Sequence, residues 1–258
     1  MIFKILFPVI ASALVSASPA AETVSEKKPI LLVLTNHAKL GDTGKTTGFF
    51  LSEAAHPWQV FSKAGYDVKL ASPTGGFAFV DKKSHDLEDE VNAAFWEKYG
   101  RTNKDGSKGT GATAAMADVK PGEYAAVFYA GGHGTMWDFR GIQEIQRVTA
   151  EIYEAGGAVG AVCHGPAALI DVKLKDGSAL VKGKRIAAFT NEEEEAVGLT
   201  RVVPYLLQTE LENAGATHVP GEKFKENAIR DGRLATGQNP ASATKAAELL
   251  VEALSVKE

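Results

Sequence analysis

The sequence has few features that could stabilise a chain without a core of its own. It contains one cysteine, Cys163, so no disulfide can form within the chain and a disulfide-stapled small protein is excluded. It also lacks a charge excess, because 28 Lys and Arg residues stand against 32 Asp and Glu residues, for a formal charge of −4. This balance argues against a basic nucleic-acid-binding protein and against a disordered acidic chain. With 258 residues, 45% of them hydrophobic, the composition is that of a soluble globular protein with a sizeable core.

Sequence patterns typical of bound metals and phosphates are absent too. The six histidines form neither a two-turn helical pair nor a pairing with cysteine at the spacing of metal ligands: His37, His56, His85, His133, His164 and His218. The chain has no phosphate-binding loop signature either. We therefore expect no metal and no cofactor.

The N-terminus has the pattern of a secretory signal peptide. Lys4 supplies a positive charge, an uncharged apolar stretch follows, and the small residues Ser18 and Ala20 stand where a signal peptidase inspects the chain. The uncharged stretch 5–21 contains two prolines and is shorter than the roughly 20 residues that span a bilayer, which disfavours the alternative of an uncleaved anchor. We expect residues 1–20 to be a signal peptide and 21–29 a polar lead. The mature protein would then be exported, periplasmic or secreted, without membrane contact.

Apolar runs alternate with helical patterns along the rest of the chain. The expected strands are residues 30–35, 66–72, 124–130, 158–162, 185–190 and 234–237. The expected helices are residues 48–64, 140–155, 200–213 and 240–254. This alternation predicts a single doubly wound, flavodoxin-like α/β domain over 30–258, with a mostly parallel sheet and helices on both faces. Residues 73–121 do not fit the alternation and are expected to be an insertion, either a surface excursion or a lid over a substrate.

The strongest catalytic candidate is Cys163, which directly follows the expected strand 158–162. His164 and Gly165 come next, and a strand that ends in a nucleophile and turns through glycine into a helix has the form of a nucleophile elbow. The positive end of a helix dipole and the adjacent imidazole would both favour the reactive thiolate. The alternative is a buried, inert cysteine.

Two other segments carry candidate polar groups. Gly131 and Gly132 follow a strand, where their N–H groups could stabilise an oxyanion, and the next residue, His133, either faces a substrate or, as we favour, is a packed imidazole. Glu53 lies beside an apolar stripe of its helix, where it is either a desolvated carboxyl of raised pKa or a solvated first-turn residue. The acidic run 192–195 is expected to be a solvated face.

Four segments together resemble the ThiJ/PfpI superfamily, which shares the class I glutamine amidotransferase-like fold. Within it, the chain is similar to the branch of heat-shock chaperone-like, glutathione-independent glyoxalases, also called glyoxalase III. The similarity extends from about residue 30 to residue 254. The four segments are Glu-Ala-Ala-His-Pro within 48–58, Gly-Gly-His-Gly-Thr-Met-Trp-Asp-Phe at 131–139, Ala-Val-Cys-His-Gly-Pro-Ala at 161–167, and Gly-Gln-Asn-Pro-Ala-Ser within 231–243.

The resemblance implies a role for each matching residue. Cys163 corresponds to the nucleophile, His164 to its triad neighbour, and Glu53 to the acid that hydrogen-bonds the thiol. The oxyanion contacts of the family correspond to backbone N–H groups near Gly132 and His164.

The resemblance also implies an acidic third member of the triad. It falls in the segment 189–198, where the match indicates Glu194. Because four glutamates follow one another, Glu193 and Glu195 stay open as alternatives.

The reaction implied by the resemblance is the conversion of methylglyoxal or glyoxal to lactate or glycolate. It would pass through a hemithioacetal on Cys163, with a small dicarbonyl as the partner and without glutathione, metal or nucleotide. Relatives often dimerise, so a homodimer is left open. Three alternatives remain: a holdase chaperone, an oxidation sensor based on Cys163, and a cysteine hydrolase or amidase of the superfamily.

Overall fold

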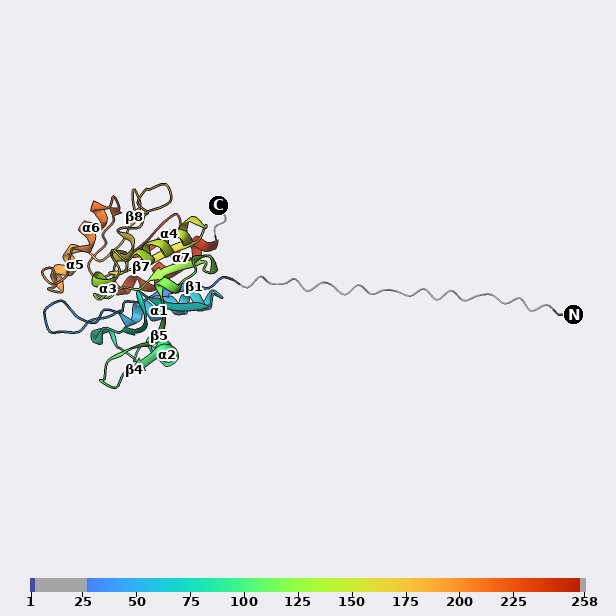
Figure 1. The fold of residues 1–258 in the computed structure, drawn as a ribbon, viewed down its shortest axis with the longest axis horizontal. Helices are drawn as coiled ribbons and strands as arrows, with labels where there is room; N and C mark the ends of the chain where they lie inside the picture. Colours follow the sequence, from blue (N-terminus) through green and yellow to red (C-terminus); the bar gives the residue numbers. More distant parts are fainter. Residues whose placement is uncertain (3–26, 256–258) are drawn as a thin grey trace.

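The computed structural model describes residues 1–2 and 27–255 (Figure 1). The expected signal peptide, from its third residue on, and most of the expected polar lead therefore lie outside the described residues. The strands are β1 (Ile30–Val33), β2 (Val68–Ser72), β3 (Thr74–Phe79), β4 (Gly100–Thr102), β5 (Lys108–Ala115), β6 (Ala126–Tyr129), β7 (Ala158–Val162), β8 (Arg185–Ile186), β9 (Thr217–His218), β10 (Ala228–Asp231) and β11 (Leu234–Gly237). The α-helices are α1 (Leu51–Lys63), α2 (Glu90–Tyr99), α3 (Thr135–Asp138), α4 (Gln143–Glu154), α5 (Asn191–Ala196), α6 (Leu207–Asn213) and α7 (Ala243–Ser255). Short 3₁₀ helices are η1 (Lys82–Ser84), η2 (Met116–Asp118), η3 (Pro121–Glu123), η4 (Gly165–Leu169) and η5 (Pro240–Ser242).

A parallel sheet forms the centre of the domain. Strands β11, β7, β6, β1 and β2 lie in that order and are all parallel, with Ile30 of β1 in register with Val68 on one side and Ala126 on the other. Every residue of β1, β6 and β7 is buried, because helices cover both faces of the sheet. This is the mostly parallel α/β sheet that the sequence predicted.

Helices pack on the sheet through apolar stripes. In α4 the buried residues Ile145, Val148 and Ile152 recur at helical spacing and face β6 and β7. Helix α7 packs against α1 and against β7 and β11 (Figure 1). Within residues 1–2 and 27–255, none of the helices combines the length and apolar character that crossing a bilayer requires.

The stretch 73–121, expected to be an excursion or a lid, instead lengthens the sheet. Strand β5 pairs parallel to β2 and carries β3 and β4 antiparallel on it, which gives a nine-stranded sheet. Helix α2 packs against α1, and its N-terminus is capped by Asp89, which accepts from the N–H groups of Val91 and Asn92 at 2.9 Å each. Only Asp81 and Lys83 of this stretch line the pocket described below.

Other elements also differ from the sequence prediction, which did not include the helices α2, α3 and α5 or the strand β9. The expected strand 185–190 contributes only β8, which pairs with β9 in a separate two-stranded sheet. Strand β10 was not predicted and closes the edge beyond β11 as an antiparallel strand. Helix α6 begins at Leu207 rather than at residue 200, and Pro204, which has no N–H to donate, lies in the turns and bends before it.

The parallel strands deliver their carboxyl ends to one edge of the sheet. The chain leaves β6 into Gly131 and Gly132 and leaves β7 into Cys163, and these two strands are neighbours. Polar groups that follow parallel strands gather at such an edge. The candidate site therefore forms there.

Candidate active site

Cys163 occupies a strained turn at the end of β7. Its φ of 59° lies in the left-handed region, which is costly for a residue other than glycine. Two backbone hydrogen bonds hold it there, from the Cys163 N–H to Gly237 O at 2.8 Å and from the Phe189 N–H to Cys163 O at 3.0 Å. Gly165 follows because a Cβ at that position would collide with the carbonyl of Tyr129. The turn is a nucleophile elbow in its backbone, as the sequence predicted.

The helix after the elbow differs from the expectation. It is the five-residue 3₁₀ helix Gly165–Leu169, so the expected dipole of a long helix is not available to the thiol. Burial raises the pKa of Cys163, and the backbone N–H groups of Gly132 and His164, which point at the sulfur, offset only part of this rise. These are the two N–H groups that the resemblance assigns to the oxyanion site.

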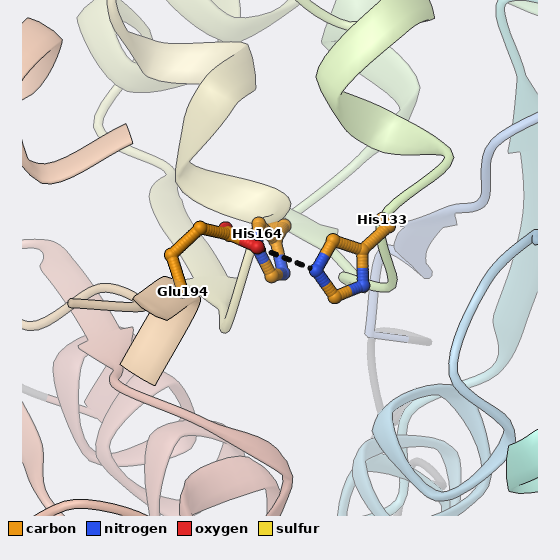
Figure 2. A group of neighbouring side chains, drawn as sticks. All are labelled: His133, His164 and Glu194. Carbon is orange, nitrogen blue, oxygen red and sulfur yellow. Dashed lines mark hydrogen bonds and ion pairs between the residues drawn. The ribbon is translucent and has the colours of Figure 1, made fainter. Parts of the chain in front are cut away.

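A single carboxylate joins two imidazoles beside the elbow (Figure 2). His164 Nδ1 lies 3.3 Å from Cys163 Sγ, and His164 Nε2 lies 2.8 Å from Glu194 Oε2. The second oxygen, Glu194 Oε1, lies 2.9 Å from His133 Nε2. The sequence favoured a packed imidazole for His133. The ring does pack against His164, with centroids 4.1 Å apart, but it also pairs with Glu194 and lines the pocket, which the sequence did not indicate.

The charges of this cluster follow from burial and pairing. Burial alone would raise the pKa of Glu194, but His164 and His133 outweigh it and lower that pKa to about 2. Burial, together with the nearby His133, lowers the pKa of His164. Glu194 is therefore ionised and accepts the Nε2–H of His164, which leaves Nδ1 of the neutral ring free to accept the proton of the Cys163 thiol.

Glu53 enters the site from the first turn of α1. Its side chain is fully buried, so the solvated alternative that the sequence left open is wrong. Oε2 accepts the Gly131 N–H at 2.9 Å, and a Cβ on Gly131 would stand 2.5 Å from that oxygen. Oε1 is buried and has no hydrogen-bond partner, while the carboxyl as a whole interacts with the Cys163 thiol.

The protonation states of Glu53 and Cys163 are coupled. Burial raises the pKa of Glu53 to about 8, in spite of its hydrogen bonds to Cys163 and Gly131. Burial also raises the pKa of Cys163, and a charged Glu53 raises it further. The sequence predicted a thiol of lowered pKa, and the difference arises because Cys163 is only 3% exposed. Since two negative charges cannot share this site, the pair does not lose both protons, and the carboxyl holds a proton whenever the sulfur is a thiolate.

The acidic run 192–195 is a solvated face, as the sequence predicted, only at its two ends. Glu193 and Glu194 are buried, whereas Glu195 is exposed, and it is Glu194 that contacts His164. Glu193 points elsewhere, and its Oε1 accepts from Asn239 Nδ2 at 2.9 Å. Of the three alternatives for the triad acid, only Glu194 has the geometry.

Glu193 has a distinct task that the sequence did not indicate. Its Oε1 also accepts from Gln238 Nε2 at 3.1 Å and from the Phe224 N–H at 2.8 Å. Gln238 and Asn239 belong to the Gly-Gln-Asn-Pro-Ala-Ser segment, which was known only as a mark of the resemblance. The segment ties the loop of Phe224 to helix α5.

Asp138 holds the loop that follows β1. Its carboxylate accepts from Thr35 Oγ1 at 2.7 Å, from the Asn36 N–H at 2.8 Å and from the His37 N–H at 3.1 Å. Burial raises the pKa of Asp138 to about 6 against these contacts. The loop continues into Lys45, which lines the pocket, so Asp138 acts on the wall of the site and not on the thiol.

One group among the described residues has the donor atoms to hold a metal ion. His133, His164 and Glu194 offer ligand atoms that all lie within 4.8 Å of one another (Figure 2). Both Nε2 atoms are at hydrogen-bond distance from Glu194, so an ion would have to break both hydrogen bonds to bind.

Cys163 lies at the bottom of a pocket of about 280 Å³. Polar and apolar residues from several parts of the chain line it: Leu40, Lys45, Thr46, Phe50, Asp81, Lys83, Gly132, His133, Cys163, His164, Phe189, Val197, Leu199, Phe224 and Pro240. The sequence-predicted residues Cys163, His164, Gly132 and His133 therefore share one cavity, while Glu53, Gly131 and Glu194 support it from behind.

Known proteins share this fold and much of this sequence. The chain is 35% identical over 231 residues to Glyoxalase 3 of Candida albicans, covering 87% of this chain and 97% of that protein. It is 33% identical over 235 residues to the glutathione-independent glyoxalase HSP31 of Saccharomyces cerevisiae, covering 88% and 98%. The crystal structure of glyoxalase III from Candida albicans superposes with a TM-score of 0.74 at 32% identity, covering 87% of this chain and 96% of that one. The model of the DJ-1/PfpI family matches residues 46–253, and the chain belongs to this family.

Proposed function

We propose that this protein is a glutathione-independent glyoxalase that converts methylglyoxal to lactate and glyoxal to glycolate. The observation that carries the proposal is the position of Cys163 Sγ, at the bottom of a pocket between the buried carboxyl of Glu53 and Nδ1 of His164. The glyoxalases named above, similar over nearly the whole of their length, support it.

The first step is addition of the sulfur to the aldehyde. The thiolate of Cys163 forms a bond to the aldehyde carbon, and the carbonyl π electrons move to oxygen. The N–H groups of Gly132 and His164 point at the sulfur and so lie beside the oxyanion that forms there. The proton that Glu53 holds while the sulfur is a thiolate then goes to that oxygen, which gives a neutral hemithioacetal and an ionised Glu53.

The second step is an internal oxidation and reduction of the substrate. Glu53 as a carboxylate, or His164, removes the proton from the carbon bound to sulfur, and an enediol forms. Return of a proton to the neighbouring carbon reduces the former ketone and oxidises the former aldehyde to a thioester. A carboxyl whose pKa is about 8 can both take and give a proton near neutral pH.

The third step is hydrolysis. Neutral His164, oriented by Glu194, takes a proton from water while the water oxygen attacks the thioester carbon. The carbon–sulfur bond breaks, and the 2-hydroxy acid leaves. Over the cycle one water is added to the dicarbonyl, with no net change in oxidation state, so no external oxidant or reductant is consumed.

The test is product formation in buffer that contains neither glutathione nor added metal. We expect lactate from methylglyoxal with the wild-type protein and none with Cys163→Ala, with circular dichroism showing that the variant is folded. Lactate formation that survives Cys163→Ala would contradict the proposal. Wild-type protein that forms no lactate but cleaves amide substrates would favour a hydrolase instead.

We also propose that the protein is exported after removal of residues 1–20. Support comes from Lys4, the apolar stretch that follows it, and the small residues Ser18 and Ala20. N-terminal sequencing of the protein from its own cells should begin at Ala21. A mature chain that begins at Met1 would refute cleavage.

A further inference from the structure

The pocket above Cys163 is larger than methylglyoxal requires. Its volume is about 280 Å³. A water molecule takes up about 30 Å³ of the liquid, so this space equals that of about nine waters. Methylglyoxal carries only a methyl group beyond its two carbonyls and would leave most of the pocket to solvent. The volume therefore fits a substrate with a longer side arm.

An aromatic path leads from the catalytic imidazole to the rim of the pocket. The ring of Phe189 lies over His164 with centroids 4.3 Å apart, and the ring of Phe224 lies 6.4 Å from that of Phe189. All three residues line the pocket. A substrate whose aldehyde carbon reaches Cys163 would lay its side arm along these two rings.

The outer part of this path is apolar and open to solvent. In residues 27–255 three large hydrophobic side chains are strongly exposed, and two of them line this pocket: Phe224 at 47% and Val197 at 43%, with Leu87 lying elsewhere. Exposed apolar surface around a cavity is typical of a ligand-binding site. A bound apolar group would remove this surface from water.

Phe224 is held at the rim against its own backbone preference. Its φ is 58°, a left-handed conformation that is strained for an aromatic residue. The hydrogen bond from its N–H to the buried carboxylate of Glu193, at 2.8 Å, keeps it there. The fold thus maintains a strained residue whose side chain faces solvent, and packing of the core does not account for it.

The rim beside these rings is positively charged. Lys45 and Lys83 line the pocket, and neither ammonium has a carboxylate within 4.0 Å among the described residues. Asp81 faces the same rim, but its oxygens already accept from Thr47 Oγ1 at 3.0 Å and from the Lys83 N–H at 2.9 Å. The two ammonium groups outnumber the one carboxylate, so the rim attracts a negatively charged group.

We propose that the preferred substrates are α-oxoaldehydes larger than methylglyoxal, with an aromatic or similar apolar group and an anionic end. The apolar group lies along Phe189 and Phe224, and the anion faces Lys45 and Lys83. This assignment rests on the proposed glyoxalase function and defines its substrate class.

The aromatic half of the assignment is tested with methylglyoxal and phenylglyoxal, which would give lactate and mandelate. The two aldehydes differ in intrinsic reactivity, so the measured quantity is the ratio of their kcat/KM values, compared between variants. We expect Phe224→Ala to lower the phenylglyoxal-to-methylglyoxal ratio roughly tenfold, the effect of losing one aromatic contact. The matched control, Leu87→Ala, removes an exposed apolar side chain away from the pocket and should keep the wild-type ratio.

The anionic half is tested with para-carboxyphenylglyoxal against phenylglyoxal. We expect the double variant Lys45→Ala/Lys83→Ala to lower the ratio of the charged to the uncharged substrate by about threefold or more, because the cations are exposed. The wild-type preference should weaken as salt is raised. The control is Lys82→Ala, which removes the neighbouring charge but does not line this pocket.

The outcomes separate this assignment from the proposed function. Equal losses with both substrates in Phe224→Ala would mean a structural role and would overturn the aromatic half. An unchanged ratio in the double lysine variant would overturn the anionic half. Wild-type protein inactive on every aldehyde would overturn the glyoxalase function itself.

Discussion

Replacing Glu53 with Gln should separate two tasks that the buried carboxyl performs together. Glutamine has the same shape, so its oxygen can accept the Gly131 N–H and its amide can donate to the sulfur of Cys163, as the protonated acid does. It cannot take up or release a proton. We expect kcat/KM for methylglyoxal to fall about 10²–10⁴-fold, the usual worth of general acid–base help, while the site keeps its structure.

The same substitution should change how stability depends on pH. The pKa of Glu53 rises from 4.5 to about 8 on folding, because burial disfavours its charged form. A raised pKa stabilises the folded state fully below 4.5, and this contribution is lost as the pH rises towards 8. A pKa difference of this size corresponds to about 5 kcal/mol in the free energy of unfolding. The wild-type protein loses this stability as the pH rises through the two pKa values, and Glu53→Gln does not.

Urea unfolding between about pH 5 and about pH 9 measures this difference. The free energy of unfolding of the wild-type protein should fall relative to that of Glu53→Gln by several kcal/mol as the pH rises. The matched control is Glu226→Gln, an exposed glutamate, whose profile should stay parallel to the wild-type one. Parallel profiles for Glu53→Gln would show that Glu53 ionises normally in the folded protein and would refute the shared-proton description.

Three other substitutions test the supports of the site. Gly131→Ala places a methyl group 2.5 Å from Glu53 Oε2, so thermal unfolding should reveal a loss of about 3 kcal/mol, and an unchanged Tm would contradict the close approach. Glu193→Gln turns a buried carboxylate that accepts from four N–H groups partly into a donor, so urea unfolding should reveal a loss of about 2 kcal/mol or more. Wild-type stability would count against that network. His133→Ala removes a group that lowers the pKa of Glu194, so that pKa rises and the acid limb of the kcat/KM profile should move to higher pH, and an unmoved limb would argue against the pairing.

Much of the fold could be read from local patterns. The runs beginning at Ile30, Ala126 and Ala158 are wholly apolar, and such runs become parallel strands because both of their faces must be covered. The segment 73–121 could not be read this way, because β3 and β5 are rich in glycine, alanine and threonine. They join the sheet only through the pairing of β5 with β2 and of β3 with β5. The two-residue strand β8 is set by contacts with β9 far along the chain.

The site was predictable where a residue acts through its own neighbours in sequence. The turn at Cys163 and His164 is such a case. The pairing of His133 with Glu194 joins residues 61 positions apart, and no spacing rule predicts it. The environment of Glu53 was equally hidden, since its burial is decided by Gly131, whose lack of a side chain leaves room for the carboxylate.

Two adjacent glutamates at the start of α5 point in different directions. Glu194 binds the imidazoles that handle protons at the bottom of the cavity, and Glu193 anchors Phe224 at its entrance. The first turn of α5 thus links the catalytic imidazoles to the entrance of the pocket. Any displacement of α5 would move both glutamates at once. A mutation here that changes the substrate preference would therefore also be expected to change kcat.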